Sequence, residues 1–385
     1  MTFILPKPTN FLAKSAVYSP ETAGAGDLDE TLLPQWNLDD LYTSIDAPTL
    51  IADLEQAQTR CVEFEDTWKG KLSAAVMNNC KVQYLMIHLR HIMRLGLNDL
   101  RKEKPYQLED RVEQLFHEKS LTGRGAFNRL FDETTNGLRF NIDGEDLPLE
   151  RAFNHLQDAD EHARSKAFKS ISTVFDENIR TFALITNTLA KDKEISDRWR
   201  GFEDVADSRH LDNRVEREVV DALVAAVRES YPRISHRYYA MKAKWLGMEK
   251  LQAWDRNAPL PETPDALVGW PEAKNIVLSA YNDFLPEMAD TARQFFDKNW
   301  IDAPARDGKA PGAFAHPTVP SAHPYVLLNY LGKPRDVMTL AHELGHGVHQ
   351  VLAAEQGALM ASTPLTLAET ASVFGEMLTF RFYAG

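Results

Sequence analysis

The segment His342-Glu343-Leu344-Gly345-His346 decides how this chain is interpreted. It has the pattern H-E-x-x-H. On a helix, His342 and His346 are one turn apart, so both imidazoles project from the same face and can share a metal ion. Glu343 is turned to the side of that pair, within reach of a water molecule at such a metal. Two nitrogen ligands beside a carboxylate base are typical of zinc hydrolases that cut amide bonds. A buried helix with two core histidines is the alternative interpretation.

The residues around this motif predict a helix. Pro334 suits a first turn, and no proline interrupts residues 337–352. Gly357 lies just after the expected end of the helix. Gly345 and Gly347 each cost about 1 kcal/mol relative to alanine inside a helix. We therefore expect that another backbone packs close to this helix.

A tetrahedral site with one open position needs a third protein ligand. One large class of zinc peptidases takes it from the same segment, as H-E-x-x-H-x-x-G-x-x-H, but His349 and Leu352 occupy the required Gly and His positions here. A second helix offers Glu369, far enough along the chain for a loop around residues 363–364 to turn it back. We predict that Glu369 completes the ligand set of one zinc ion per chain. Glu355, on the first helix, is a weaker candidate.

Three further side chains are candidates for supporting roles. Glu376 follows Glu369 by seven residues, so both lie on the same face of the second helix. We expect Glu376 to hold a ligand imidazole through its free N–H, although an ordinary half-buried carboxylate fits equally well. Tyr330 and His349 lie near the motif in sequence and are weak candidates for substrate contacts, since packing is the more usual role of such residues.

A strand is predicted at residues 325–330, where β-branched, aromatic and aliphatic residues are flanked by Pro324 and Gly332. It comes just before the helix that is predicted to carry His342 and His346, which we call the metal helix. We expect it to form a sheet edge next to that helix, where a substrate peptide pairs with its free backbone groups. An ordinary core strand is the alternative.

The rest of the chain is predicted to be mainly α-helical. Apolar residues recur with 3–4 spacing in stretches that we expect to face the core, namely residues 50–68, 108–115, 168–189 and 219–227. Proline- or glycine-rich linkers lie between such stretches, at residues 19–34, 136–148 and 258–271. A last apolar stripe needs cover from further sequence or from a partner, and it consists of Leu367, Ala371, Phe374, Leu378 and Phe382.

Length, composition and charge indicate a globular protein. The 385 residues can bury the cores of two or three domains, and contents of 44% hydrophobic and 26% charged residues are ordinary for a soluble chain. A net charge of −13 argues against nucleic-acid partners and anionic membranes. This charge would favour basic peptides, although an acidic balance is more often a solubility feature.

Cysteine usage and the N-terminus bear on the compartment. Cys61 and Cys80 fit a reducing environment, and Cys61 falls on an apolar helix stripe, so we expect a buried free thiol. Residues 1–17 lack an apolar core of signal-peptide length. The chain has no run of 18 apolar residues that could span a membrane. We therefore expect a cytoplasmic protein without membrane contact.

Several segments together resemble the oligoendopeptidase F family, a branch of the thimet-oligopeptidase-like zinc metallopeptidases. The matching stretches are residues 33–42, 118–127, 313–314, 324–330, 342–349 and 367–372. The resemblance covers most of the chain. It implies a mainly α, zincin-like metalloendopeptidase that hydrolyses short peptides in a deep channel. It also implies that His342, His346 and Glu369 are zinc ligands and that Glu343 is the catalytic base.

The resemblance also implies a longer catalytic domain than this chain contains. Members of the family have a long segment after the third ligand, with a glycine-rich loop and with His and Tyr residues that stabilise the oxyanion, whereas this chain ends 16 residues after Glu369. We therefore expect three regions: an N-terminal helical region at 1–105, an oligoendopeptidase F-type N-terminal domain at 106–190, and a C-terminally incomplete zinc metallopeptidase domain at 191–385.

Three functions remain open from the sequence. The first is a zinc-dependent endopeptidase of short peptides. The second is a truncated zinc-binding fragment with little or no catalytic activity, which needs the missing segment or an oligomer contact to complete its cleft. The third is a helical binding protein that retains the motif only by descent.

Overall fold

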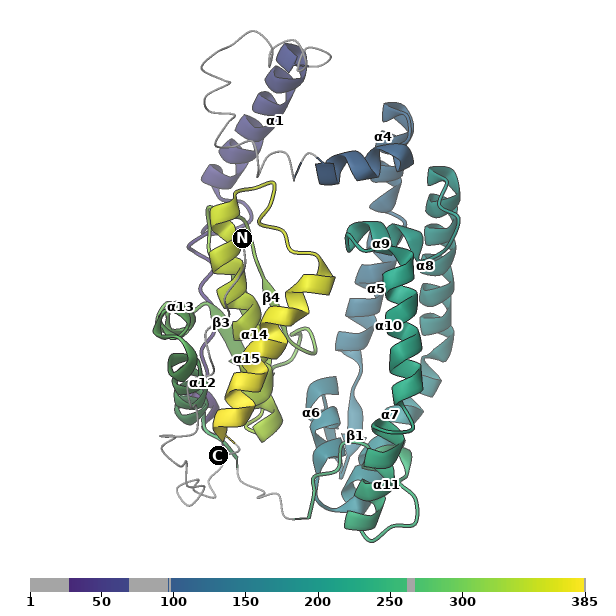
Figure 1. Ribbon diagram of the computed structural model, residues 1–385, viewed down its shortest axis with the longest axis vertical. Coiled ribbons are helices and arrows are strands. Elements are labelled where there is room, and N and C mark those ends of the chain that lie inside the picture. Colours follow the sequence, from purple (N-terminus) through teal and green to yellow (C-terminus); the bar gives the residue numbers. More distant parts are fainter. Residues whose placement is uncertain (1–27, 69–95, 97, 262–266, 384–385) are drawn as a thin grey trace, which may run out of the picture.

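The computed structural model describes residues 28–68, 96, 98–261 and 267–383, and these are mainly α-helical. Two groups of elements lie side by side (Figure 1). We call them the N-terminal layer, residues 98–261, and the C-terminal layer, residues 267–383. The C-terminal layer contains the metal helix, and the N-terminal layer faces it.

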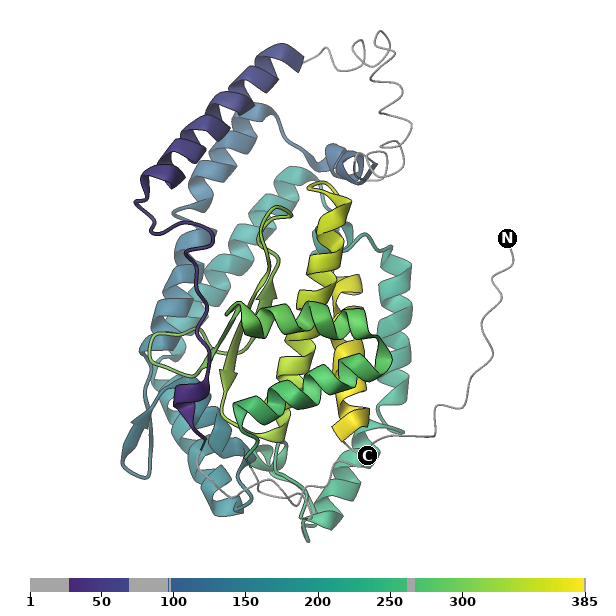
Figure 2. The ribbon, with the colours of Figure 1, turned by 90° about the vertical axis from the view of Figure 1, so that its left-hand side faces the viewer.

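The C-terminal layer packs four helices against a three-stranded sheet. Its helices are α12 (Trp270–Phe284), α13 (Pro286–Asp297), α14 (Pro334–Ala353) and α15 (Leu365–Tyr383). Figure 2 shows α12 and α13 lying across α14 and α15. One continuous apolar core joins these helices to the sheet, with Phe295, Val326 and Leu340 fully buried in it. The metal helix α14 is therefore held from several sides.

The sheet consists of β3 (Ile301–Pro304), β4 (Phe314–His316) and β5 (Tyr325–Tyr330), in the order β3-β5-β4. The expected strand is present with the predicted bounds, but the expectation that it forms the sheet edge is wrong. β5 pairs in parallel with β3 and antiparallel with β4, so neither of its sides is free. Among the described strands, β4 lies at the edge of this sheet next to the site, and none pairs with its outer side.

The N-terminal layer is built from helices and one hairpin. Its elements are α4 (Asp110–Ser120), α5 (Arg124–Gly137), β1 (Phe140–Ile142), β2 (Glu145–Leu147), α6 (Leu149–Asn154), α7 (Glu161–Glu177), α8 (Ile179–Arg200), α9 (Asp207–Asp212), α10 (Arg217–Ser230) and α11 (Ser235–Trp245). The stripe predicted over 168–189 divides between α7 and α8 at Asn178. It buries Ile171 and Ile185, as expected.

Two of the predicted core stripes are exposed instead. Helix α1 (Pro48–Trp68) projects from the rest of the molecule (Figure 1), and Phe64 on its stripe is 59% exposed. Cys61 is an exposed free thiol, so the expectation of a buried one is wrong. Leu223 on α10 is 62% exposed. These side chains are largely exposed, and helical spacing alone does not determine what covers a stripe. Cys80 and residues 1–17 lie outside the described residues.

Polar contacts join the two layers. The Glu150 carboxylate on α6 accepts a hydrogen bond from the Gly312 N–H at 2.6 Å, just before β4. The Thr366 hydroxyl at the start of α15 donates to the Asn213 carbonyl at 3.0 Å. The N-terminal segment also contacts the sheet, because the Ala303 N–H on β3 donates to the Pro34 carbonyl at 2.9 Å.

Among the described helices, none is both long and apolar enough to cross a membrane.

Candidate metal centre

Three predicted ligands lie together between α14 and α15. The Glu369 Oε2 atom is 3.2 Å from His342 Nε2 and 3.6 Å from His346 Nε2. One ligand atom from each residue lies within 4.8 Å of the other two. Zinc bonds of about 2.0–2.2 Å place neighbouring atoms of a tetrahedral site roughly 3.3–3.6 Å apart. The donor set and its spacing therefore fit one zinc ion, with room for a fourth ligand.

The metal helix has the predicted extent and the predicted close neighbours. It begins at Pro334, and a short 3₁₀ turn, Ala354–Gln356, follows it before Gly357. A Cβ atom added to Gly345 would lie 2.7 Å from the Ala371 carbonyl oxygen on α15. A Cβ atom on Gly347 would lie 2.6 Å from the ring of Phe295. Gly345 therefore lets α14 approach α15, which carries Glu369, and Gly347 makes room for the ring of Phe295 on α13.

Glu343 lies next to the ligands in a buried environment. Its residue is only 6% exposed. Burial, helped by the nearby charge of Glu369, raises the pKa of the Glu343 carboxyl from 4.5 to about 7, against the opposing effect of His342. Burial also lowers the pKa of His346, which favours the neutral imidazole that a metal requires. A carboxyl with a pKa near neutrality is suited to accept and return a proton.

Two residues on α15 contact the side chains of the predicted ligands. The Glu376 Oε2 atom lies 3.3 Å from His342 Nδ1, so Glu376 lies where the sequence predicted it, beside a ligand imidazole. The Ser372 hydroxyl donates to Glu369 Oε2 at 2.9 Å, and this serine is fully buried. Both contacts restrict how a ligand side chain can turn.

A third contact fixes the backbone of the metal helix. The Tyr281 hydroxyl, on α12, donates to the Ala341 carbonyl at 2.6 Å, directly before His342. Tyr281 is fully buried, and this burial raises the pKa of its hydroxyl. The hydroxyl therefore stays protonated and acts as a fixed donor to α14.

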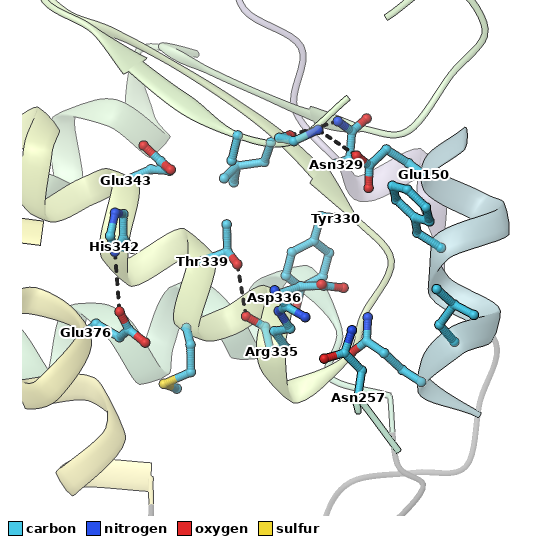
Figure 3. A pocket seen from close by; sticks show the side chains of 17 residues that line it. Glu150, Asn257, Asn329, Tyr330, Arg335, Asp336, Thr339, His342, Glu343 and Glu376 are labelled. Carbon is cyan, nitrogen blue, oxygen red and sulfur yellow. Dashed lines mark hydrogen bonds and ion pairs between the residues drawn. The ribbon is translucent and has the colours of Figure 1, made fainter. Parts of the chain in front are cut away.

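Two cavities meet at the metal centre, and both are lined by His342 and Glu343. The first, which we call the polar cavity, has a volume of about 630 Å³ and lies between α14, the sheet and α6 (Figure 3). Its wall includes Glu150, Asn329 and Arg335. The second, which we call the alanine-lined cavity, has a volume of about 690 Å³ and lies between β4 and the loop before α15. The two cavities provide space on both sides of the ligands.

The weaker candidates lie at the borders of this site. Tyr330 lines the polar cavity, but it is almost fully buried and its hydroxyl donates to the Val268 carbonyl at 2.8 Å. His349 lines the alanine-lined cavity and is half-buried. Glu355 is exposed and is not a member of the ligand group. Substrate contact by Tyr330 or His349 stays a prediction.

Sequence reasoning missed the residues that act from a distance. Tyr281 lies on another helix, and Glu150 lies far along the chain from the motif, so no local spacing indicates either. Ser372 had a detectable signal, because it follows Glu369 by three residues and such a pair can interact on a helix.

Comparison with known proteins identifies relatives for most of the chain. A model of peptidase family M3 matches residues 154–382, and a model of Oligopeptidase F matches residues 91–140. Oligopeptidase PepF of Bacillus subtilis (strain 168) is 24% identical over 261 residues, which is 66% of this chain and 38% of that protein. Group B oligopeptidase PepB of Streptococcus agalactiae serotype III (strain NEM316) is 26% identical over 284 residues, which is 71% of this chain and 46% of that protein. The chain thus spans less than half the length of these two relatives.

A solved structure shares the fold. PZ peptidase A, determined with an inhibitor, matches with a TM-score of 0.65 and 19% identity, over 85% of this chain and 58% of that one.

Proposed function

Because the chain belongs to peptidase family M3, we propose that it is a zinc-dependent endopeptidase that hydrolyses short peptides. The observation that carries this proposal is the group formed by His342, His346 and Glu369, with the buried Glu343 beside it. The three ligands would hold one zinc ion. When bound, zinc acts as a Lewis acid that activates a water molecule and polarises a carbonyl group.

Glu343 supplies the proton transfers of the proposed reaction. Its carboxylate accepts a proton as water attacks the carbonyl carbon of the peptide bond, and it then donates that proton to the leaving amine. The raised pKa of Glu343 supports this role, because a group that titrates near neutral pH can act in both directions. Glu376 and Ser372 keep His342 and Glu369 oriented through the whole reaction.

The substrate would lie along β4. This strand has an open edge, and its residues Phe314 and Ala315 line the alanine-lined cavity. A peptide that adds to such an edge gains main-chain hydrogen bonds with little sequence preference. Gln350 on α14 donates to the Ala315 carbonyl at 3.0 Å and fixes the strand against the metal helix.

The cytoplasmic location stays a prediction from the sequence.

The second candidate is a zinc-binding chain with little activity. The observation that favours it is the large exposed apolar surface of α15, where Leu367 is 60% and Phe380 is 55% exposed. The exposed apolar residues of α15 differ from the stripe predicted from the sequence. Leu378 and Phe382 belong to the predicted stripe but pack against the core.

Zinc analysis and peptide hydrolysis together test both candidates. We expect one zinc per chain, and turnover of an internally quenched peptide that a chelator abolishes and added zinc restores. Zinc at full stoichiometry without turnover would favour the second candidate. Absence of zinc after loading would contradict both.

A further inference from the structure

The polar cavity contains an arginine whose guanidinium group is free of hydrogen bonds to the described residues, although its charge acts on the adjacent Asp336, where it opposes the rise that burial causes in the pKa of that carboxyl. Arg335 lies in the first turn of α14 and is exposed to this cavity. Its guanidinium group makes no hydrogen bond or ion pair with another described residue. Among the described residues that line the cavity there is no other arginine and no lysine. Figure 3 shows Arg335 on the same helix as His342, within the space between α14, the sheet and α6.

Three of the four acidic side chains of the same cavity already contact a donor. Glu150 accepts the Gly312 N–H, Asp336 accepts two backbone N–H groups at 2.9 and 3.0 Å, and Glu376 contacts the ring of His342. The fourth, Glu343, is the buried residue beside the ligands. Among the described residues of this wall, Arg335 is therefore the side chain whose charged N–H groups are free to donate to a carboxylate.

The position of Arg335 on α14 sets its distance from the reacting bond. It precedes His342 by seven residues, so both side chains lie on the same face of the helix. Seven residues correspond to about 10 Å along a helix axis. An extended peptide advances about 3.3 Å per residue, so it covers this distance in about three residues.

The direction of β4 determines which end of the peptide reaches Arg335. Gly312 and Ala313, just before this strand, line the polar cavity, and the strand itself runs along the alanine-lined cavity. The loop before β4 is fixed, because the Asn329 amide donates to the carbonyls of Ala310 and Gly312 at 3.0 and 2.9 Å. A peptide that pairs antiparallel with β4 therefore places its C-terminal part in the polar cavity.

We infer that Arg335 binds a carboxylate of the substrate about three residues to the C-terminal side of the cleaved bond. The carboxylate is either the C-terminus of the peptide or an acidic side chain. A guanidinium group binds such a group through two parallel hydrogen bonds. This inference rests on the proposed function, because it needs a peptide lying across the metal centre. It makes Arg335 a specificity-determining residue that favours peptides ending at a set distance from the cleaved bond.

The test uses quenched peptides that are identical up to the cleaved bond and end one to five residues beyond it. Each is made as a free acid and as a C-terminal amide, and amidated peptides with Glu, Gln or Lys at the third position form a separate arm. For the free acid of three residues we expect kcat/KM about 10–100-fold above that of its amide, as a charge-assisted hydrogen bond provides. Free acid against amide tests the C-terminus, and Glu against Gln tests the side chain.

Variants of Arg335 then test whether this residue causes the preference for the free acid over the amide. Arg335→Gln should remove it, and Arg335→Lys should retain part of it. Arg293→Gln is the matched control, since Arg293 is exposed on α13 and lies outside both cavities. An unchanged ratio of acid to amide in Arg335→Gln would overturn the inference while the proposed function stands. A preference for Lys at the third position would overturn it as well.

A binding measurement separates this inference from catalysis. The same peptides are titrated, by fluorescence anisotropy, into zinc-loaded Glu343→Gln protein with and without Arg335→Gln. We expect the free acid to bind about 10-fold or more tightly than the amide only when Arg335 is present. If no peptide is hydrolysed by the wild-type chain, the proposed function fails, and this titration still decides the role of Arg335. Equal binding of acid and amide would reject it.

Discussion

Gly345 on the metal helix lies directly against the backbone of Ser372, so that a Cβ atom on the glycine would be only 2.8 Å from the Ser372 Cα atom. The two helices that carry the ligands meet at this point. The separation between the two helices depends on the absence of a side chain at Gly345. The distance from the two histidines to Glu369 depends on it as well.

Gly345→Ala should therefore separate α14 from α15 and destabilise the protein. We expect the free energy of unfolding to fall by about 1–3 kcal/mol or more, which is the usual cost of overpacking. Gly137→Ala is the matched control, because a Cβ atom at the end of α5 would meet nothing within 4 Å. Urea unfolding of the zinc-free proteins measures both. Equal stability of the two variants would contradict the close contact.

Removal of the third ligand should release the metal. Glu369→Ala should weaken zinc binding by more than the roughly 10–100-fold that outer contacts cost. Glu355→Ala serves as control, since this exposed carboxylate lies outside the ligand group. Competition with a fluorescent zinc chelator gives both affinities. Loss of zinc from Glu355→Ala with retention in Glu369→Ala would reverse the ligand assignment.

Glu343→Gln should separate metal binding from hydrolysis. The amide has nearly the same shape as the carboxylate but cannot accept a proton, so zinc stoichiometry should persist while peptide turnover falls by about 10²-fold or more. Metal analysis and a quenched-peptide assay on the same sample provide the comparison. Turnover close to that of the wild type would exclude Glu343 as the base.

Glu376→Gln should weaken the site without destroying it. The carboxylate contacts His342 Nδ1 at 3.3 Å and holds the orientation of that imidazole. We expect zinc affinity to fall by about 10-fold or more, with the fold retained. Circular dichroism controls for the fold. An unchanged zinc affinity would make Glu376 an ordinary surface carboxylate.

Low pH should reveal an ion pair that stabilises the N-terminal layer. Two hydrogen bonds from Arg200, at 2.7 and 2.8 Å, lower the pKa of the Glu113 carboxyl from 4.5 to about 2. A lowered pKa stabilises the folded state above pH 4.5, and this contribution disappears as the pH falls from about 4.5 to about 2. Because the pair is partly exposed, we expect about 1 kcal/mol.

Glu113→Gln should be less stable than the wild type at pH 6, and the difference should shrink between pH 4.5 and pH 3. The exposed Glu109→Gln is the control. Urea midpoints at several pH values measure the difference. A gap that stays constant down to pH 3 would show that the charge of Glu113 does not contribute.

The sequence predicted the features that depend on local spacing. The positions of His342, Glu343 and His346 on one helix, the extent of that helix and the place of Glu369 beside it all follow from helical periodicity and from one turn between two helices. The pairing of β5 did not follow, because β3 and β4 have only four and three residues and carry little pattern of their own. The prediction that Cys61 is buried was wrong for a related reason. An apolar stripe shows which face of a helix is apolar, but it does not show whether another element packs on that face.

The predicted ligands and the predicted base lie within 28 consecutive residues, from His342 to Glu369, whereas the far wall of the polar cavity comes from α6. Under the proposed function, chemistry and choice of substrate are thus encoded in separate parts of the chain. Substitutions around Glu150 and Phe153 would then alter which peptides fit while the predicted ligand set stays intact. An inhibitor that binds only the metal ion would act on any protein with the same set of three metal ligands. One that extends to α6 could discriminate between close relatives, and resistance to it could arise there without loss of catalysis.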